Sequence, residues 1–312
     1  MILNVLLTGG AGYLGSVLVG NLLRRGYRVT VLDSLLYGQT SLLQYCTHTN
    51  FAFVRGDARD ERLVRDILPK YDVIILLAAV VGMKACDADP IMARSVNLDA
   101  VRMLNRFRSP DQEVVFPCTN SGYGTKSGEF YCTEETPMDP ITLYGITKVQ
   151  AERELLASPN TISIRLATVF GPSPRMRFDL LVNDFVYRAV TDGFLVIYEK
   201  DFKRNYVHIE DVANAFCFCI EHFEDMKGEA YNVGLNEANL SKSELALKIK
   251  EHVPSLYIHY AEVGEDTDKR NYIVSNEKIN RKGFVARRTL DEGIEQLIKV
   301  CKMVPKGVFQ NS

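Results

Sequence analysis

The stretch TGGAGYLG at residues 8–15 decides the fold of this chain. It follows a short apolar run at 3–8 and opens a helical pattern at 13–25, so its glycines lie in a turn from a strand into a helix. Glycine permits a tight turn here and lets the backbone approach a pyrophosphate, which the N–H groups at the helix start can bind. The motif predicts a dinucleotide site with contacts from Gly9, Gly12, Tyr13, Leu14 and Gly15.

Asp33 ends the next apolar run, 18 residues after Gly15. A carboxylate at this point can accept hydrogen bonds from the ribose hydroxyls of an adenosine and would repel a 2′-phosphate. The next three residues, SLL, offer no arginine that would hold such a phosphate. The pattern favours NAD over NADP, and the alternative interpretation of Asp33 is a solvated acid at a strand end.

Two later strand ends add weaker candidates for the same cofactor. The acid of GD at 56–57 would lie near the adenine amino group, unless it is only a turn residue. The small residues of LLAA at 76–79 would leave room for the backbone of the cofactor. The residues assigned to the cofactor at these two ends are Asp57, Ala58, Leu77, Ala78 and Ala79.

Around these motifs, short apolar strands alternate with amphipathic helical segments. We expect strands at 3–8, 28–33, 51–56, 72–78, 113–117 and 161–167, and helices at 13–25, 60–68, 89–107 and 142–157. This alternation predicts an α/β Rossmann-type fold, a doubly wound parallel sheet with helices on both faces. Beyond about residue 170 the alternation loosens, with a helical pattern at 180–193. We expect an NAD-binding domain at 1–168 and a smaller substrate-binding lobe at 169–312, partly interleaved with it.

Composition excludes several other classes of protein. The chain has 312 residues, 46% of them hydrophobic, and a net charge of −2 without basic blocks, which argues against a nucleic-acid partner. No apolar run is long enough to span a bilayer, and the N-terminus lacks the basic region of a signal peptide. Seven cysteines without a CxxC pair are typical of reduced thiols in a cytosolic enzyme. A metal at Cys217 and Cys219 is disfavoured, because two residues apart on a helix they face different ways. We expect a cytoplasmic protein with no metal site.

Tyr144 and Lys148 lie four residues apart in YGITK, so on a helix they share one face. The ammonium, together with the positive charge of a bound nicotinamide, would lower the pKa of the tyrosine toward working pH. A phenolate can then take a proton from a sugar hydroxyl while hydride leaves the same carbon. The motif is common by chance, and its weight comes from its position after the glycine turn, Asp33 and the polar strand tip CTNSGYG at 118–124.

In these motifs and their order the chain resembles the extended short-chain dehydrogenase/reductases, specifically the nucleotide-sugar epimerase/dehydratase family. The resemblance covers nearly the whole chain through TGGAGYLGS, GD, LLAA, VN, TNSGYG, PMDPITLYGITK, RLATVFGP, RNYVHIEDVANA, YNVG and DKRNY. Within the family the chain looks most similar to bacterial NAD-dependent GDP-heptose 4-dehydrogenases, which share TNSGYG and the run RLATVFG, SPRMR and DLLVNDF.

The resemblance implies a role for individual residues. Tyr144 would be the general base, Lys148 its partner and a ligand of the nicotinamide ribose, and Thr119 the hydrogen-bond partner of the sugar C4 oxygen. Asn97 would be a structural or an active-site polar residue. Toward the substrate the resemblance implies Val81, Asn120, Ser121, Thr168, Arg177, Asn183, Arg204 and Arg270.

Several of these substrate residues have open alternatives. Arg204 and Arg270 would reach the diphosphate or ribose, or else be solvated surface charges. The cluster of Arg175, Met176 and Arg177 would grip a phosphate or an unusual sugar tail, or lie in a solvated loop. His208 is expected to be a structural hydrogen-bonder. Thr168 and Asn205 depart from the Asn and Asp that many relatives have at these positions, so sugar contacts of hexose enzymes do not carry over.

Three reactions of the family share oxidation at C4, and the strand tip separates one of them. In its dehydratases two acids follow the threonine, whereas this chain has Asn120 and Ser121. An amide is no general acid at neutral pH, and a serine without a base partner removes a C5 proton poorly. We therefore expect NAD-dependent C4 oxidation of a GDP-heptose or GDP-hexose, in the synthesis of bacterial surface-polysaccharide precursors, without loss of water.

Two alternatives remain beside this expectation. A nucleotide-sugar 4-epimerase of the UDP-hexose type needs only Thr119, Tyr144, Lys148 and NAD. A non-catalytic NAD-binding sensor would be of a different class, and such proteins usually lose the tyrosine or the lysine, which are both present here. The resemblance also implies tightly bound NAD and a homodimer formed through the segments at 89–107 and 142–157.

Overall fold

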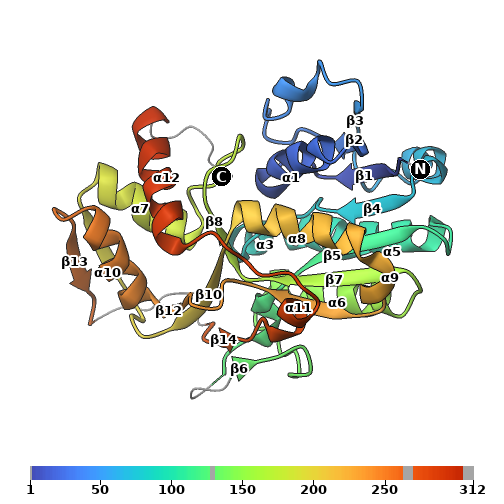
Figure 1. Cartoon of the computed structure of the whole chain (residues 1–312). Coiled ribbons are helices and arrows are strands. Elements are labelled where there is room, and N and C mark those ends of the chain that lie inside the picture. The colour runs from blue at the N-terminus through green and yellow to red at the C-terminus, as the bar shows by residue number, and fades with distance from the viewer. Residues whose placement is uncertain (1, 127–130, 263–269, 305–312) are drawn as a thin grey trace.

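The computed structural model describes residues 2–126, 131–262 and 270–304. Its centre is a seven-stranded parallel sheet with the order β11-β7-β5-β4-β1-β2-β3 (Figure 1). The strands are β1 (Asn4–Thr8), β2 (Arg28–Asp33), β3 (Phe51–Arg55), β4 (Val73–Leu76), β5 (Glu113–Thr119), β7 (Thr161–Leu166) and β11 (Ala230–Val233). The chain adds β2 and β3 on one side of β1 and the remaining strands on the other, so a topological switch point lies between β1 and β4. The predicted Rossmann-type fold is confirmed.

Alternate residues of each central strand enter two different hydrophobic cores, because successive side chains of a strand point to opposite faces. On one face Leu7 and Ile75 share a core with α1 (Tyr13–Arg24) and α8 (Ile209–Glu221). On the other face Leu6, Ile74 and Phe116 pack with α2 (Glu61–Ile67), α5 (Ala100–Phe107) and α6 (Leu143–Leu156). Burial on both faces explains why the strands read as continuous apolar runs.

The helix predicted at 89–107 is not continuous. It consists of α4 (Pro90–Arg94), a single π-helical turn (Ser95–Asp99) and α5, and a further helix α3 (Met83–Ala88) precedes it. Asp89 separates α3 from α4, since its side chain accepts a hydrogen bond from the Met92 N–H at 2.9 Å and Pro90 follows as the first helical residue. Strand β4 is also shorter than the predicted run at 72–78, because its residues after Leu76 turn into the loop that approaches Gly9.

The C-terminal part of the chain adds three small sheets to this framework. They pair β8 (Thr168–Phe170) and β12 (Asn239–Ser241) with β10 (Lys203–His208), β9 (Phe194–Ile197) with β13 (Tyr257–Tyr260), and β6 (Tyr131–Cys132) with β14 (Ile273–Val274). Besides α8, its helices are α7 (Leu181–Thr191), α9 (Phe223–Met226), α10 (Lys242–His252), α11 (Glu277–Arg281) and α12 (Leu290–Met303). Strand β11 returns to the large sheet and pairs with β7. The domain boundary at residue 168 stays a prediction.

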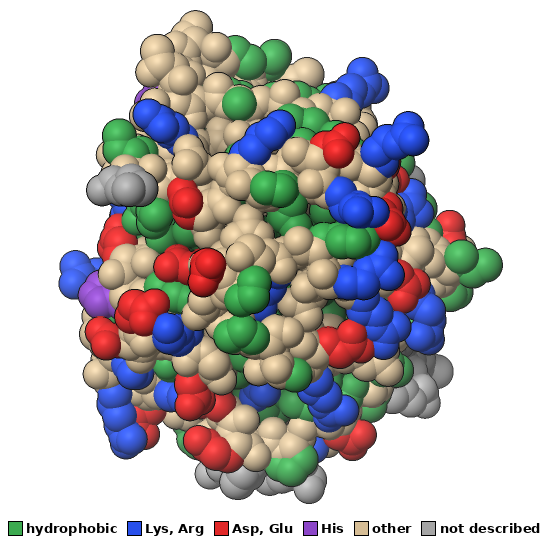
Figure 2. Space-filling model, turned by 90° about the vertical axis from the view of Figure 1, so that its right-hand side faces the viewer, with side chains coloured by type: hydrophobic (Ala, Val, Ile, Leu, Met, Phe, Trp, Pro, Cys, Tyr) green, Lys and Arg blue, Asp and Glu red, His purple; other side chains and the backbone are tan. Residues whose placement is uncertain are grey.

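The surface on the side away from β13 and α10 is neither uniformly charged nor uniformly hydrophobic. Figure 2 shows Lys and Arg interspersed with Asp and Glu there, and hydrophobic side chains scattered among them. Within the described residues, none of the helices has the length and apolar character needed to cross a bilayer. The seven cysteines are unpaired, and six are buried, with Cys46 exposed. Among the same described residues, no three His, Cys, Asp or Glu side chains come together as a metal site would require.

Candidate active site

Gly9 and Gly15 stand where a side chain would collide with backbone. Gly9 has a φ of +73°, and a Cβ there would lie 2.5 Å from the backbone nitrogen of Ala78, just beyond β4. A Cβ on Gly15 would lie 2.5 Å from the Cα of Gly10. Helix α1 follows Gly12 without a side-chain cap, so its first N–H groups and its dipole are available to an anion. The turn therefore fits the pyrophosphate of a dinucleotide.

Asp33 holds the glycine turn from the end of β2. Its Oδ2 accepts a hydrogen bond from the Ala11 N–H at 2.9 Å, and its Oδ1 accepts one from the Leu35 N–H at 2.8 Å. Burial raises the pKa of this carboxyl, and the two N–H groups act in the opposite direction. With 8% of the residue exposed, the solvated strand-end interpretation of Asp33 is wrong. Nε2 of Gln39 also donates to Oδ1 at 3.4 Å, so Oδ2 is the carboxylate oxygen that keeps a lone pair for a ribose hydroxyl.

Asp57 follows β3 and is engaged by a neighbouring side chain. Its carboxylate receives Nε and NH2 of Arg59 at 3.0 and 2.6 Å and also accepts the Arg59 N–H at 2.8 Å. The Arg59 guanidinium lowers the pKa of Asp57. The adenine contact of Asp57 stays a prediction. The other cofactor candidates at the ends of β3 and β4 are partly exposed, namely Ala58, Leu77, Ala78 and Ala79.

Asn97 supports the loop that follows β4. From the π-helical turn, its Oδ1 accepts the Val80 N–H at 2.8 Å and its Nδ2 donates to the Val80 carbonyl at 2.9 Å. Its Nδ2 also lies 3.4 Å from Oγ1 of Thr147, next to Lys148 on α6. The side chain is 1% exposed, so Asn97 ties the loop bearing Val81 to the catalytic helix. Its role is structural, as one of the two predicted interpretations had it.

The polar tip of β5 continues into a 3-10 turn at Asn120–Tyr123. The Thr119 hydroxyl donates to Oγ of Ser121 at 3.0 Å and accepts the Ser121 N–H at 3.1 Å. NH1 of Arg270 donates to the same Ser121 Oγ. Asn120 is fully buried, and both atoms of its amide lack a hydrogen-bond partner among the described residues. The tip thus joins Thr119, Ser121 and Arg270 and leaves the Asn120 amide unused.

Helix α6 brings Tyr144 and Lys148 to this tip. Thr142 caps the helix by accepting the Gly145 N–H at 3.2 Å, and a Cβ on Gly145 would lie 3.4 Å from the Ser121 carbonyl oxygen. Burial raises the pKa of the Tyr144 phenol above its ordinary value. The guanidinium groups of Arg177 and Arg270 act to lower this pKa and only partly offset the effect of burial. That Lys148 and a bound nicotinamide lower this pKa stays a prediction for the enzyme with its cofactor.

Lys148 lies in an apolar environment on the same helix. It is 3% exposed, and its Nζ is 4.0 Å above the centre of the Phe116 ring. Burial lowers the pKa of this amine to about 8, while Cys118 and Glu152 act to raise it. The amine therefore changes its charge near neutral pH, where a cofactor ribose or a phenolate could bias it.

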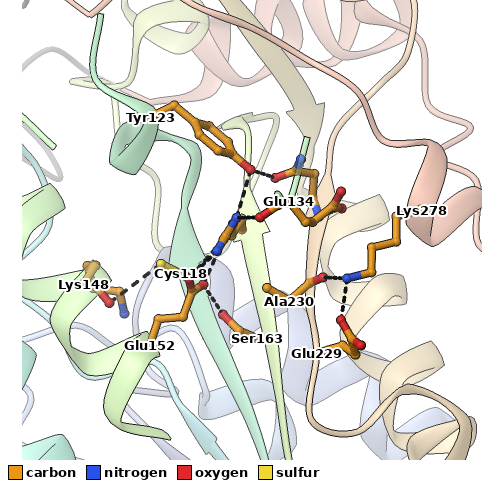
Figure 3. Close-up of polar contacts among 11 residues, drawn as sticks. Cys118, Tyr123, Glu134, Lys148, Glu152, Ser163, Glu229, Ala230 and Lys278 are labelled. Atoms are coloured by element: carbon orange, nitrogen blue, oxygen red, sulfur yellow. Dashed lines mark hydrogen bonds and ion pairs between the residues drawn. The ribbon is translucent and has the colours of Figure 1, made fainter. Parts of the chain in front are cut away.

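A buried polar network joins the catalytic helix to the strands beside it (Figure 3). Glu152, one turn after Lys148, receives NH2 of Arg165 at 2.7 Å and the Ser163 hydroxyl at 2.6 Å. NH1 of Arg165 donates to the Tyr123 hydroxyl at 3.1 Å, and this hydroxyl donates to Asn232 at 2.8 Å. The network joins α6, β7, the tip of β5 and β11. The sequence motifs did not predict this network, although the spacing of Lys148 and Glu152 already places both on one face of the helix.

Three of the arginines considered for the substrate are buried, so their solvated alternatives are wrong, whereas Arg270 is partly exposed. Arg175, Arg177 and Arg204 are 4%, 8% and 3% exposed. Arg177 forms a bidentate ion pair with Asp179, and its NH2 would lie 3.8 Å from a Cβ on Gly82 in the loop after β4.

Arg204 and Arg270 approach the tip of β5 from the C-terminal lobe. The Arg204 guanidinium lies 5.4 Å from the centre of the Tyr272 ring, which in turn meets the Tyr123 ring edge-on. Arg270 follows two residues of the DKRNY motif, Asp268 and Lys269, that lie outside the described residues. Contacts of these arginines with a diphosphate stay predictions.

Asn183 and His208 have structural bonding partners. Nδ2 of Asn183 donates to the Arg177 carbonyl at 2.9 Å and to the Tyr13 hydroxyl at 3.2 Å, which ties α1 to the loop before α7. The substrate contact of Asn183 stays a prediction. His208 is fully buried, with its Nδ1 accepting the Glu210 N–H at 3.2 Å and its Nε2 3.0 Å from Gln296. The predicted structural role of His208 is confirmed.

Residues 5–234 match the model described as the NAD dependent epimerase/dehydratase family. The chain belongs to this family. The low-salt glycan biosynthesis protein Agl12 of Haloferax volcanii is 30% identical over 311 residues, covering 95% of this chain and 97% of that protein. The CDP-paratose 2-epimerase of Salmonella typhi is 25% identical over 336 residues, covering 95% and 98%.

Solved structures of this epimerase/dehydratase fold superpose over almost the whole chain. A dTDP-glucose 4,6-dehydratase from Bacillus anthracis in complex with NAD has a TM-score of 0.83 at 23% identity and covers 96% of this chain and 97% of that one. A UDP-glucuronic acid 4-epimerase from Bacillus cereus has a TM-score of 0.84 at 22% identity and covers 96% and 99%. At these identities the likeness concerns the fold.

Membership of the epimerase/dehydratase family confirms two predictions, that the protein is an enzyme and that its cofactor is NAD. The residues present fit this cofactor, because the Gly9 and Gly15 turn leaves room for a pyrophosphate and Asp33 lies at the end of β2 with free acceptor capacity. When bound, NAD supplies a hydride acceptor.

Proposed function

We propose that this protein oxidises C4 of a nucleotide-activated sugar, a GDP-linked heptose or hexose. It releases the 4-keto product without eliminating water. One observation carries the proposal. The buried tip of β5 presents Thr119 beside the start of α6, and the two positions after it hold an amide and a hydroxyl that is bonded to an arginine. Neither Asn120 nor Ser121 can act as the acid and base that elimination of water needs.

In this proposal each residue of the chain has a defined task. Thr119 accepts a hydrogen bond from the C4 hydroxyl as the sugar binds and orients it, and Tyr144 as phenolate then takes the proton of this hydroxyl. The guanidinium groups of Arg177 and Arg270 act to stabilise the phenolate, and the charge of a protonated Lys148 would act in the same direction. Asn120 has a free donor and acceptor for a hydroxyl of the substrate. Arg204 would bind the diphosphate, since a guanidinium matches phosphate geometry.

The choice of a GDP-sugar rests on the resemblance to GDP-heptose 4-dehydrogenases in TNSGYG and in the run from RLATVFG to DLLVNDF. The role in surface-polysaccharide precursor synthesis rests on the same resemblance, and the Haloferax relative carries glycan biosynthesis in its name. A cytoplasmic homodimer formed through the segments at 89–107 and 142–157 is part of this proposal.

A nucleotide-sugar 4-epimerase is the second candidate. Relatives include a UDP-glucose 4-epimerase of Lactobacillus helveticus, 26% identical over 274 residues. Either reaction needs only Thr119, Tyr144 and Lys148 from the chain. In the epimerase hydride returns to the opposite face of C4, and in the dehydrogenase it does not return.

Mass spectrometry and proton NMR after incubation with GDP-, UDP- and dTDP-sugars in D2O test the proposal. The expected result is a 4-keto sugar from a GDP-sugar, with stoichiometric reduction of the bound NAD. A product lighter by one water would overturn both the dehydrogenase and the epimerase. Turnover of UDP-glucose to UDP-galactose, with no reaction of GDP-sugars, would establish the epimerase instead.

A further inference from the structure

We propose that Arg270 is a positioning residue of the catalytic tip, which acts through the Ser121 hydroxyl on Thr119 and does not bind the diphosphate. This inference rests on the proposed function, because it takes Thr119 and Tyr144 as the groups that act at C4. The carrying observation is the chain of contacts from the Arg270 guanidinium to Ser121 Oγ and from there to Thr119 Oγ1.

The direction of these hydrogen bonds follows from counting donors and acceptors. Ser121 Oγ accepts the Thr119 hydroxyl proton and an Arg270 N–H, which uses both of its lone pairs. Its own proton is then the only hydrogen-bonding capacity that it has left. Thr119 Oγ1 donates to Ser121 and accepts the Ser121 N–H, so one lone pair remains to it. With Arg270 in contact, Ser121 can only donate to a substrate oxygen and Thr119 can only accept from a substrate hydroxyl.

This arrangement matches the chemistry required at C4. The C4 hydroxyl has one proton to donate. It can donate this proton to Thr119 while the sugar enters the site, and to Tyr144 in the reacting complex. The fixed Ser121 donor can serve the carbonyl oxygen that forms at C4 or a neighbouring oxygen. Without Arg270 the two hydroxyls could rotate and exchange their roles, since a hydroxyl proton turns freely about its C–O bond.

The backbone after Arg270 is held against the same tip. The Asn271 carbonyl accepts the Lys126 N–H at 2.7 Å, and the Asn271 side chain accepts the Lys203 N–H of β10 at 2.8 Å. The ring of Tyr272 then packs edge-on against Tyr123, with ring centres 6.3 Å apart. Arg270 is thus anchored to the segment that carries Ser121, and its position relative to Thr119 is set by the fold. The same guanidinium acts to lower the pKa of Tyr144.

A double-mutant cycle with Ser121→Ala and Arg270→Gln tests this role. The rate of NADH formation in a single turnover is measured with whichever sugar of the panel is oxidised. We expect each single variant to lose about 10- to 100-fold and the double variant to lose no more than the worse single one, because both changes remove one interaction. The control is Arg281→Gln, an exposed arginine on α11, which should change neither rate nor binding.

Binding of nucleoside diphosphates, measured by calorimetry with GDP, UDP, CDP and dTDP, separates positioning from phosphate binding. We expect Arg270→Gln to keep the Kd of the preferred diphosphate within about threefold, because the arginine acts on the tip. A loss of tenfold or more with an unchanged single-turnover rate would overturn the inference, as would additive losses in the cycle.

Failure of the proposed function gives a different pattern. If the wild-type enzyme forms no NADH with any sugar, the proposed reaction is wrong, while the diphosphate Kd and the Tm of the four proteins still decide on Arg270. Non-additive changes in Tm with an unchanged Kd support the Arg270–Ser121 contact, and additive changes in Tm overturn it.

Discussion

Glu152 and Arg165 form a bidentate ion pair in the interior of the protein, one helical turn beyond Lys148. The guanidinium Nε and NH2 lie 3.0 and 2.7 Å from Oε1 of Glu152, and the two side chains are 9% and 2% exposed for Arg165 and Glu152 (Figure 3). The pair joins α6 to β7 across the second face of the large sheet. The orientation of the catalytic helix therefore depends on two charges that are almost entirely removed from water.

Replacing Glu152 by Gln should destabilise the fold by about 3–5 kcal/mol, because it leaves the buried Arg165 without its counter-charge. Urea unfolding measures this loss. Glu154→Gln is the matched control on the same helix, since Glu154 pairs with Arg102 at the surface, with 40% of its side chain exposed, and should cost less than about 1 kcal/mol. Equal losses in the two variants would contradict the structural role of the buried pair.

Tyr144→Phe should lower the single-turnover rate of C4 oxidation by roughly 100- to 10,000-fold, the usual contribution of a positioned proton acceptor. Bound NAD, measured by absorbance of the released cofactor, should stay at the wild-type level. Tyr187→Phe is the control, because the Tyr187 hydroxyl is buried without a hydrogen-bond partner among the described residues. A Tyr144→Phe enzyme that turns over at the wild-type rate would exclude the tyrosine as the base.

Gly9→Ala should abolish retention of NAD, because its φ of +73° is strained for alanine and its Cβ would collide with the backbone of Ala78. Gly26→Ala separates the two effects, since Gly26 has a φ of +85° and open space around its Cβ. That control should cost about 1 kcal/mol of stability and retain the cofactor. Retained NAD in Gly9→Ala would rule out the proposed cofactor turn.

Because burial lowers the pKa of Lys148, we expect the stability of the NAD-free protein to depend on pH. The pKa of this amine is lowered to about 8 by burial, below the ordinary value, so between pH 8 and about 10 the unfolded chain binds more protons than the native one. Stability from this group should therefore rise with pH in that window, by roughly 3 kcal/mol in total. Urea unfolding of wild type and Lys148→Met at several pH values measures the difference. A difference independent of pH would show that the amine is not buried as a neutral group.

The sequence predicted most of the framework correctly. The glycine turn, the six strands of the first half and the helices at 13–25, 60–68 and 142–157 all occur close to the predicted positions. These elements depend on local patterns, such as apolar periodicity and turn chemistry, which neighbouring residues carry by themselves. The interrupted helix at 89–107 was missed because Asn97, whose side chain holds Val80 of a distant loop, lies within its π-helical turn.

The seventh strand shows a second limit. YNV at 231–233 is too short to be recognised by alternation, and it is a strand because β7 offers it a pairing edge. The arginines show a third limit of prediction from sequence. Charged residues are mostly exposed in proteins, whereas Arg177 and Arg204 are buried in the folded chain.

By itself the sequence determined the fold class, the cofactor turn, and the identity of Thr119, Tyr144 and Lys148 as candidates for catalysis, because each lies in a motif of a few consecutive residues. Only the tertiary structure decided that Asp33 binds the glycine turn, that Glu152 and Arg165 form a buried pair and that Arg270 contacts Ser121. These relationships join residues far apart in the chain, and their burial and hydrogen-bond directions arise only when the strands and helices pack.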